Sequence, residues 1–415
     1  LYKSFCQTIL VISSNQILKE LLLPIPPSFY PPQISSILNI LLTQQNNSGL
    51  FKQFSVIKSE NPANNENNQS IELTDLILQT ISEVFSRYPS FTKSSNDSNT
   101  VVDIESLKKQ GVNDQYRYSF RDLKFGLTNM IGDNSIYNHH YENNIKSDTK
   151  NTSQSRIIRL AQEIADLTFS LPIDSYNLIT IRADVNRLDI MKSMIAGAEG
   201  TPYANGLFEY HLYLPSTYPQ DPPKCNLETT GNGEVRFNPN LYSCGKVCLS
   251  LLGTWRGIAS ENWDPKISNL LQLLLSIQSV VMSEEVYFNE PGFEGESGTE
   301  EGEKRNEGYS NIVRYNNIKF AMIEHIKNPP KGFEEVVRRH FYIKRDVILT
   351  ECTQWINTAQ TKLASYYGLV SDHNHKIATR FSSSSNVYIN ELKEVVQQLE
   401  STLKGLVINN TFESI

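Results

Sequence analysis

Cysteine, long apolar runs and basic stripes are all scarce in this sequence. Its 415 residues carry a formal net charge of −7, and no basic stripe is interleaved with aromatic residues, which argues against a nucleic-acid partner. No apolar run reaches the ~18–20 residues that a membrane-spanning helix needs, so no membrane span is expected. The cysteines show neither Cys-x-x-Cys nor Cys/His metal-site spacing; they are Cys6, Cys225, Cys244, Cys248 and Cys352.

The cysteine pattern and the amino-terminal sequence also indicate the cellular compartment of the protein. Free thiols are expected in a reducing compartment, and the amino terminus lacks the basic region and cleavage site of a secretory signal. We therefore expect a cytoplasmic protein, and a nuclear location is an alternative. The chain begins at Leu1 rather than at methionine, and we expect it to be a fragment of a longer protein.

Composition divides the chain into three parts. Residues 1–150 combine helical patterns at 1–44 and 71–88 with Asn- and Ser-rich tracts, which bury too little apolar area to offset chain entropy. We interpret this part as helical segments joined by linkers and partly disordered. A core domain is expected at 154–328, and a helical extension at 329–415.

Hydrophobic periodicity predicts the elements of the core and of the extension. An amphipathic helix is expected at 156–169, with Ile158 on its apolar side. A second helix at 268–282 is apolar all round and is therefore expected to be buried. Polar or glycine-rich tracts at 132–155 and 290–308 predict loops. The remaining expected elements are strands at 178–183, 189–195, 207–214 and 224–230, and helices at 309–327, 333–358 and 387–406.

The most informative stretch runs from Arg236 to Leu249. It places the amide of Asn240 eight residues before Cys248, with Pro239 stiffening the backbone ahead of the amide and Gly245 permitting a turn before the thiol. Acyl transfer needs such parts: a thiol to hold an acyl group, and a fixed donor for the oxyanion that forms when the group is attacked. By itself this spacing is weak evidence for acyl-transfer chemistry at Cys248; the surrounding residues make the evidence strong.

Four ordered motifs around this stretch resemble those of the ubiquitin-conjugating enzymes, the E2 family, over about residues 154–328. The family's His-Pro-Asn motif has Asn in place of His here, and about seven extra residues precede the Trp-x-Pro motif. The matching residues are Tyr218 to Pro223, Asn238-Pro239-Asn240, Cys248-Leu249 and Trp263-Asp264-Pro265.

Further segments are similar to the large, extended members of that family. The amide at 238, the Gly-Thr-Trp insertion at 253–255 and the Asn-Glu-Pro-Gly-Phe segment at 289–293 are of this type. Segments at 187–192, 201–206 and 340–345 are most similar to the carboxyl-terminal part of giant proteins that combine an E2 with a ligase. This resemblance implies possible built-in ligase behaviour and an anti-apoptotic role.

The resemblance implies an α/β (α+β) fold, with a four-stranded antiparallel sheet, packing helices and helical extensions at both ends. It also implies that Cys248 receives ubiquitin as a thioester from an activating enzyme and passes it to a lysine of a protein substrate. The activating enzyme uses the ATP, so no cofactor or metal is expected. Two alternatives stay open: an E2 for a ubiquitin-like modifier, and a non-catalytic ubiquitin-binding scaffold.

Residue roles follow from the same resemblance. Asn240 would donate to the oxyanion or hold the loop, and Asn238 would replace the hydrogen bond of the missing imidazole. Glu290, with Asn289 or Tyr287 sharing the work, would assist deprotonation of the attacking lysine, although an ordinary solvated glutamate is equally compatible. Trp255 and the insertion 253–262 would flank the thiol, either as a lid or as packing. The interpretation requires Cys248 to be within reach and Asn240 to lie near it.

The resemblance also implies surfaces that contact partner proteins. Arg156 and Arg159, on the first helix, would meet the activating enzyme, or would simply be solvated. The Glu-rich segment 294–307 is expected to be a solvated loop or a contact for a basic substrate. An apolar stripe on the last helix would pack internally or form a dimer or partner seam. The expected contacts for ligases are Tyr218, Pro219, Trp263 and Pro265.

Overall fold

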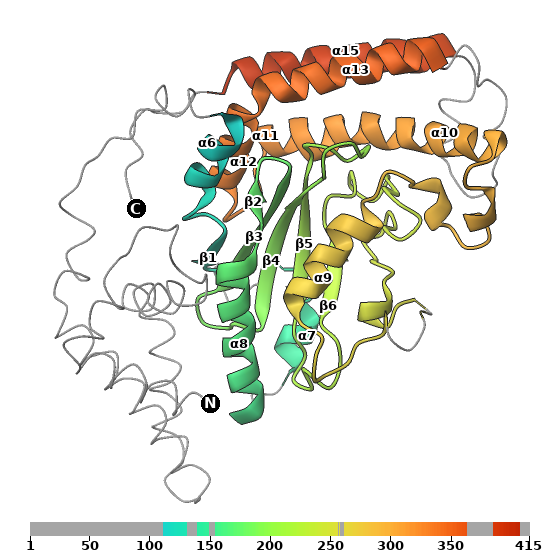
Figure 1. Ribbon diagram of the computed structural model, residues 1–415. Coiled ribbons are helices and arrows are strands. Elements are labelled where there is room, and N and C mark those ends of the chain that lie inside the picture. The colour runs from blue at the N-terminus through green and yellow to red at the C-terminus, as the bar shows by residue number, and fades with distance from the viewer. Residues whose placement is uncertain are drawn as a thin grey trace, which may run out of the picture. The chain divides into compact units, whose positions relative to one another are not determined.

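The computed structural model describes residues 111–130, 139–148, 154–255, 257, 261–362 and 385–406. The expected helices at 1–44 and 71–88 lie outside these residues. The chain divides into two compact units; residues 153–169 belong to one, and residues 103–152 and 170–410 belong to the other. Figure 1 shows the second unit as a sheet with helices packed around it. None of the described helices is long and apolar enough to cross a membrane.

The sheet contains the four expected antiparallel strands, in sequential order β3-β4-β5-β6. Two short strands that the sequence did not reveal extend it: β1 pairs with β3 in parallel, and β2 pairs with β3 antiparallel. The predicted four-stranded core is therefore confirmed and is enlarged at the β3 edge. The strands are β1 Phe125–Thr128, β2 Ile173–Asp174, β3 Asn177–Asp184, β4 Ile190–Ala196, β5 Leu207–Tyr213 and β6 Lys224–Leu227.

The segment before the core is more structured than the composition suggests. The expected linker at 132–155 contains the helix α7, Glu142–Ser147, so the prediction of a loop there is wrong for those residues. Ile145 of this helix is buried against Ile190 of the sheet, and this tertiary contact is absent from any local pattern. The helix α6, Val112–Phe120, precedes β1.

The long apolar helix crosses one face of the sheet, as Figure 1 shows for α9, Leu270–Ser276. It continues as the π-helical turn η7, Ile277–Val281. The amide of Gln278 donates from this turn to the carbonyl oxygen of Ala196 at 2.8 Å. Leu275 and Val280 are 36% and 59% exposed, so the expectation of a helix buried on every side is wrong.

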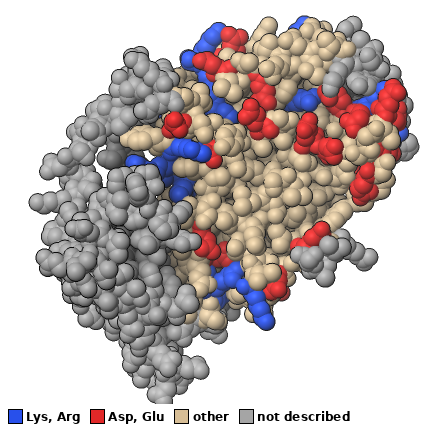
Figure 2. Space-filling model, in the orientation of Figure 1, with Lys and Arg blue, Asp and Glu red and all other residues tan. Residues whose placement is uncertain are grey.

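The next helix begins earlier than the Glu-rich composition predicts. The segment expected to be a loop up to residue 308 is helical from residue 300, because Thr299 caps the helix by accepting a hydrogen bond from the Gly302 N–H at 3.0 Å. Glutamates in the first turn interact favourably with the helix dipole. Figure 2 shows acidic side chains gathered at the edge of the molecule where α10 begins. The helical run comprises α10 Glu300–Asn316, η10 Asn317–Glu324 and α11 His325–Lys327.

The carboxyl-terminal extension is helical, as expected, but the single helix predicted at 333–358 is divided at Lys344. Figure 1 shows its last two helices lying side by side above α10. Val395, Leu399 and Leu403 are buried in the main core cluster, so the apolar stripe packs internally, as one interpretation held. The elements are α12 Glu334–Ile343, α13 Arg345–Lys362 and α15 Ser385–Lys404.

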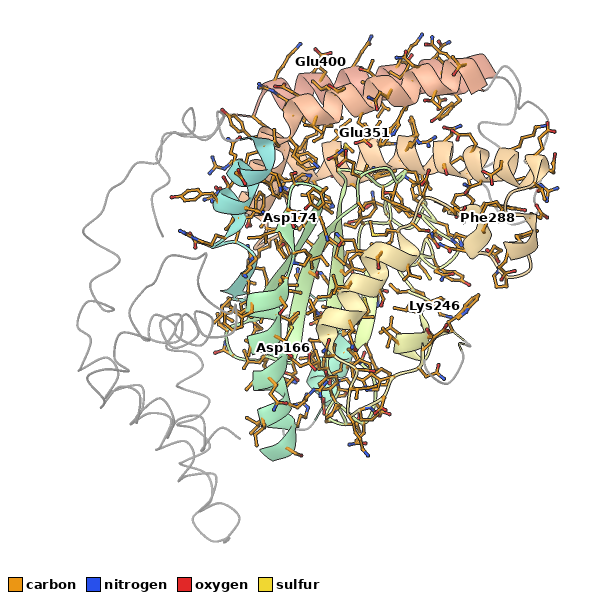
Figure 3. All side chains as sticks on the ribbon, viewed as in Figure 1. Asp166, Asp174, Lys246, Phe288, Glu351 and Glu400 are labelled. Carbon is orange, nitrogen blue, oxygen red and sulfur yellow. The ribbon has the colours of Figure 1, made fainter. Side chains whose placement is uncertain are left out.

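The extension is attached to the β4–β5 connection through polar bonds. His340 is fully buried, and burial lowers its pKa to about 3, so the ring is neutral. Its Nε2 lies 2.9 Å from the Asn205 carbonyl oxygen, and its Nδ1 lies 2.5 Å from the Tyr116 hydroxyl. Glu351, labelled in Figure 3, accepts from the Asn205 amide, and burial raises its pKa to about 7.

A second polar attachment holds the same connection against η10. Asn317 is fully buried, and its Nδ2 donates to the carbonyl oxygens of Pro202 and Ala204, each at 3.1 Å. A Cβ on Gly206 would lie 1.7 Å from Asn317 Oδ1, so glycine is required for this close approach. The β4–β5 connection is therefore fixed from two sides, and it carries Tyr203 towards the loop that contains Cys248.

The helix α8, Gln154–Ser170, belongs to the other unit and is described by itself. Its buried positions are Arg156, Leu160, Glu163 and Leu167, whose spacing of four, three and four residues marks one helix face. Ile158, expected on that face, is 36% exposed; the expectation for this residue is wrong.

We predict that Asn317→Ala lowers the free energy of unfolding by about 2–4 kcal/mol, because the buried carbonyls of Pro202 and Ala204 lose their donor. Urea denaturation followed by tryptophan fluorescence would measure the change. Asn357→Ala, on an exposed position of α13, is the matched control. Equal stability of the two variants would contradict the assigned role of Asn317.

Candidate active site

Cys248 and Asn240 lie opposite each other in a narrow backbone loop. The Cys248 N–H donates to the Asn240 carbonyl oxygen at 2.9 Å, and an antiparallel bridge joins Leu241 to Val247 beside it. The turn of the loop passes through Gly245, whose φ is 88° and where a Cβ would lie 2.4 Å from the Asn226 amide. The expectation that Asn240 lies near the thiol is therefore confirmed by the backbone.

Asn238 fixes this loop from the interior, where it is fully buried. Its Nδ2 donates to the Tyr203 hydroxyl at 3.0 Å and to the Val281 carbonyl oxygen at 2.8 Å. Its Oδ1 accepts from the Asn240 N–H at 2.8 Å and from Asn289 Nδ2 at 3.4 Å. One amide thus connects the loop, the end of the π-helical turn and the β4–β5 connection, which is the role expected for a replacement of histidine.

The side chain of Asn240 has a different environment from its backbone. The backbone is held on both sides, by Asn238 and by Cys248. The side-chain Oδ1 is buried and makes no hydrogen bond with the described residues. Its amide nitrogen also has no partner there. The loop is therefore held by the backbone of Asn240 and not by its side chain.

The thiol itself is covered. Cys248 is 2% exposed, so the expectation that the thiol lies within reach is wrong for this structure. Cys244, four residues earlier, is exposed. Figure 3 labels Lys246, which lies between the two cysteines in the sequence, on the loop beside α9.

Glu290 lies beside the loop and is held by a residue that sequence reasoning missed. Arg236 Nη2 lies 3.0 Å from Glu290 Oε2 and donates to the Pro239 carbonyl oxygen at 2.6 Å. The guanidinium also lies over the Tyr242 ring, 4.5 Å from its centroid. The other carboxylate oxygen, Oε1, has no partner among the described residues. The signal in the sequence was the position of Arg236, four residues before Asn240 and at the start of the stretch 236–249.

The two residues expected to assist Glu290 have mainly other contacts. Asn289 Nδ2 donates to the Val281 carbonyl oxygen at 3.2 Å as well as to Asn238, so it braces the loop. The Tyr287 hydroxyl accepts from Arg305 Nη1 at 3.2 Å, and its ring packs against Phe293 with centroids 4.8 Å apart. Both belong to η8, Tyr287–Asn289, on which Figure 3 labels Phe288.

The two segments expected to meet ligases come together in the structure. Trp263 Nε1 donates to the Pro219 carbonyl oxygen at 2.7 Å, and the Tyr218 and Trp263 rings are 5.6 Å apart. Tyr218 is 1% exposed, so it supports this surface from below. Pro265 is half-buried, in a turn closed by the Asp264 side chain.

The other expected site residues differ in their exposure and contacts. Arg156 is 5% exposed, and Arg159 forms an ion pair with Glu163 at 2.8 Å, so neither is a simple solvated charge. Trp255 is half-buried, and its role beside the thiol stays a prediction. Among the described residues, no group of three or more His, Cys, Asp or Glu side chains is arranged to hold a metal ion.

We predict that Asn238→Ala accelerates hydrogen exchange of the Asn240 amide by about tenfold or more, because that N–H loses its acceptor. Exchange measured by NMR or mass spectrometry on the loop peptide would test this. Asn262→Ala, at an exposed position, is the control. An unchanged exchange rate in Asn238→Ala would show that the buried amide does not hold the loop.

Comparison with known proteins identifies the family. The profile of the family described as ubiquitin-conjugating enzyme matches residues 159–315. The human protein named dual E2 ubiquitin-conjugating enzyme/E3 ubiquitin-protein ligase BIRC6 is 43% identical over 257 residues, which are 60% of this chain and 5% of that protein. The match thus spans only a small part of BIRC6, and it agrees with the expected similarity to a giant E2–ligase hybrid.

Two shorter relatives extend the comparison. The probable ubiquitin-conjugating enzyme protein 17 of Caenorhabditis elegans is 39% identical over 259 residues, covering 60% of this chain and 35% of that protein. The putative ubiquitin-conjugating enzyme E2 38 of Arabidopsis thaliana is 41% identical over 247 residues, covering 58% of this chain and 72% of that protein. The chain therefore belongs to the ubiquitin-conjugating enzyme family.

Proposed function

We propose that the chain carries ubiquitin as a thioester on Cys248 and transfers it to a lysine of a protein substrate. One observation carries this proposal: the Cys248 N–H is bonded to the Asn240 carbonyl oxygen at 2.9 Å. That bond places the uncommitted Asn240 side-chain amide in the same narrow loop as the thiol. The named relatives, which are ubiquitin-conjugating enzymes, support the choice of modifier.

Charging exchanges one thioester for another. The Cys248 thiol loses a proton and its sulfur attacks the thioester that the activating enzyme holds, forming a new C–S bond while the donor sulfur leaves as a thiolate. ATP is consumed earlier, by the activating enzyme, so this chain needs no cofactor of its own. Because Cys248 is 2% exposed, charging begins with a local rearrangement that uncovers Sγ.

Discharge forms the isopeptide bond. A neutral lysine amine attacks the thioester carbonyl, a C–N bond forms, and an oxyanion develops. The attacking nitrogen then releases a proton to solvent, the C–S bond breaks, and sulfur leaves as a thiolate. Asn240 Nδ2 donates to that oxyanion; its fixed backbone means that little reorganisation is needed when the charge appears. The hydrogen bonds that hold the loop are made by the backbone of Asn240 and not by its side chain, which supports this role over that of holding the loop.

The attacking lysine must first lose its proton. Glu290 is suited to attract the ammonium and accept the proton, since its Oε2 is held by Arg236 at 3.0 Å while its side chain stays 37% exposed. The ion pair fixes the carboxylate beside Pro239, which precedes Asn240 in the loop. An attacking amine would thus meet a positioned carboxylate rather than one that moves freely.

Partners and location follow from this chemistry. The activating enzyme, ubiquitin and substrate proteins are the partners, and the surface of Pro219 and Trp263 is offered to ligases. Built-in ligase behaviour is supported by the name of the human relative. The reaction needs a reduced thiol, so we place it in the cytoplasm or nucleus. An anti-apoptotic role stays a prediction from the resemblance.

We predict that the chain, given activating enzyme, ATP and tagged ubiquitin, forms an adduct that a thiol reagent removes. Cys248→Ala should abolish the adduct, whereas Cys244→Ala, at an exposed cysteine outside the loop contacts described above, should keep it. Parallel reactions with tagged ubiquitin-like modifiers would show which modifier forms the adduct. No adduct with any modifier, or an adduct that survives Cys248→Ala, would refute the proposed function.

Asn240→Asp should slow lysine discharge about 10²–10³-fold, because a donor to the oxyanion is replaced by a negative charge. The rate of charging should fall by a much smaller factor, since the loop is held by the Asn240 backbone and not by its side chain. Single-turnover charging and discharge assays on gels measure both rates. Equal loss in the two steps would favour the loop-holding role instead.

A further inference from the structure

The inserted segment after the thiol returns to the catalytic cysteine. Cys248 is followed by the 3₁₀ turn η5, Ser250–Leu252, and by Gly253, whose φ of 63° reverses the chain. The next residue, Thr254, donates from Oγ1 to the Val247 carbonyl oxygen at 2.8 Å and accepts at Oγ1 from the Leu249 N–H at 3.0 Å. Its own N–H donates to the Leu249 carbonyl oxygen at 3.3 Å.

These bonds act on both residues that flank Cys248. Val247 and Leu249 are joined through one hydroxyl, while the Cys248 N–H is bonded on its other side to Asn240. The cysteine backbone is therefore fixed at its own N–H and at both neighbours. The rotation about its side-chain bond is then the main freedom left to Sγ.

These hydrogen bonds occupy the backbone N–H groups of Cys248 and Leu249, which are the backbone donors nearest Sγ. The N–H of Cys248 is committed to Asn240, and the N–H of Leu249 is committed to Thr254. Neither is available to an oxyanion on a group attached to Sγ. The reaction must then bring its carbonyl oxygen to the Asn240 side chain, so the direction in which Sγ projects decides how well that contact is made.

We propose that Thr254 is a positioning residue, which holds Cys248 so that the thioester carbonyl faces Asn240 Nδ2. This inference rests on the proposed function, because it concerns the same thiol. It assigns the inserted segment a part in the discharge step. Thr254 touches neither substrate nor the reacting atoms; it acts through the peptides on each side of Cys248.

The chemistry of the side chain decides which substitutions are informative. Serine keeps a hydroxyl that both donates and accepts, whereas valine keeps the shape and loses both bonds. Thr254 is exposed and lies outside the apolar core, so its substitution leaves the packing of the domain unchanged. Thr353→Val is a matched control, because Thr353 is also exposed and its Oγ1 donates to the Leu349 carbonyl oxygen within α13.

The test measures discharge of the thioester to free lysine in single turnover, over a range of lysine concentrations. Thr254→Val should lower the maximal discharge rate about tenfold or more, because a small misplacement of the carbonyl is costly. Charging should change less, since it needs a reachable thiol and not alignment with Asn240. Thr254→Ser should restore most of the rate, and Thr353→Val should behave like the unaltered chain.

A second comparison separates positioning from general loss of structure. If Thr254 acts through Asn240, Thr254→Val should lower the maximal discharge rate by a much smaller factor in an Asn240→Ala background than in the unaltered chain. Discharge of Thr254→Val at the unaltered rate, or equal loss in both backgrounds, would overturn the inference. An unaltered chain that forms no thioester would instead refute the proposed function, so the two failures are distinguishable.

Discussion

The geometry of the site depends on one buried amide, that of Asn238. It is fully buried and has four polar partners. A buried amide without partners would cost a substantial part of the stability of a domain. The chain therefore keeps Tyr203, Val281 and the loop at their hydrogen-bonding distances, and the relation of Asn240 to Cys248 follows. An imidazole offers fewer donors than this amide uses, which gives a physical reason for asparagine at this position.

The carboxyl-terminal extension contributes to the same constraint from a distance. Hydrogen bonds run from Glu351 and His340 to Asn205, and the connection that contains Asn205 also carries Tyr203. The Tyr203 hydroxyl donates to the Phe237 carbonyl oxygen at 2.8 Å and receives a bond from Asn238. The helices of the extension thus hold, at Asn205, the same connection whose Tyr203 contacts the loop of Asn238 and Cys248.

The sequence predicted the parts of the fold that local patterns encode. Alternating apolar residues located the four antiparallel strands to within a few residues. The spacing of Asn240 and Cys248 predicted two residues whose backbones are hydrogen-bonded to each other. It did not predict β1, because four residues that pair with a strand more than 50 positions later have little local signal. It also placed 300–308 in a loop, because the abundance of glutamate concealed the cap that Thr299 provides.

Side-chain partners were harder to predict than positions. Glu290 was identified, but not Arg236, which holds it from 54 residues away in the sequence. Thr254 was visible only as part of an insertion, since its bonds to Val247 and Leu249 depend on the reversal at Gly253. Such contacts depend on the tertiary structure, so the periodicity of hydrophobic residues in the sequence does not predict them.

The burial of Cys248 also affects how the protein ages in the cell. Peroxide and electrophiles attack cysteines according to thiolate character and exposure, and this sulfur sits in a residue that is only 2% exposed. Cys244 is exposed nearby and would meet such reagents first. Under the proposed function, this burial protects the acyl-carrying sulfur from irreversible oxidation and makes its uncovering the first step of each charging reaction.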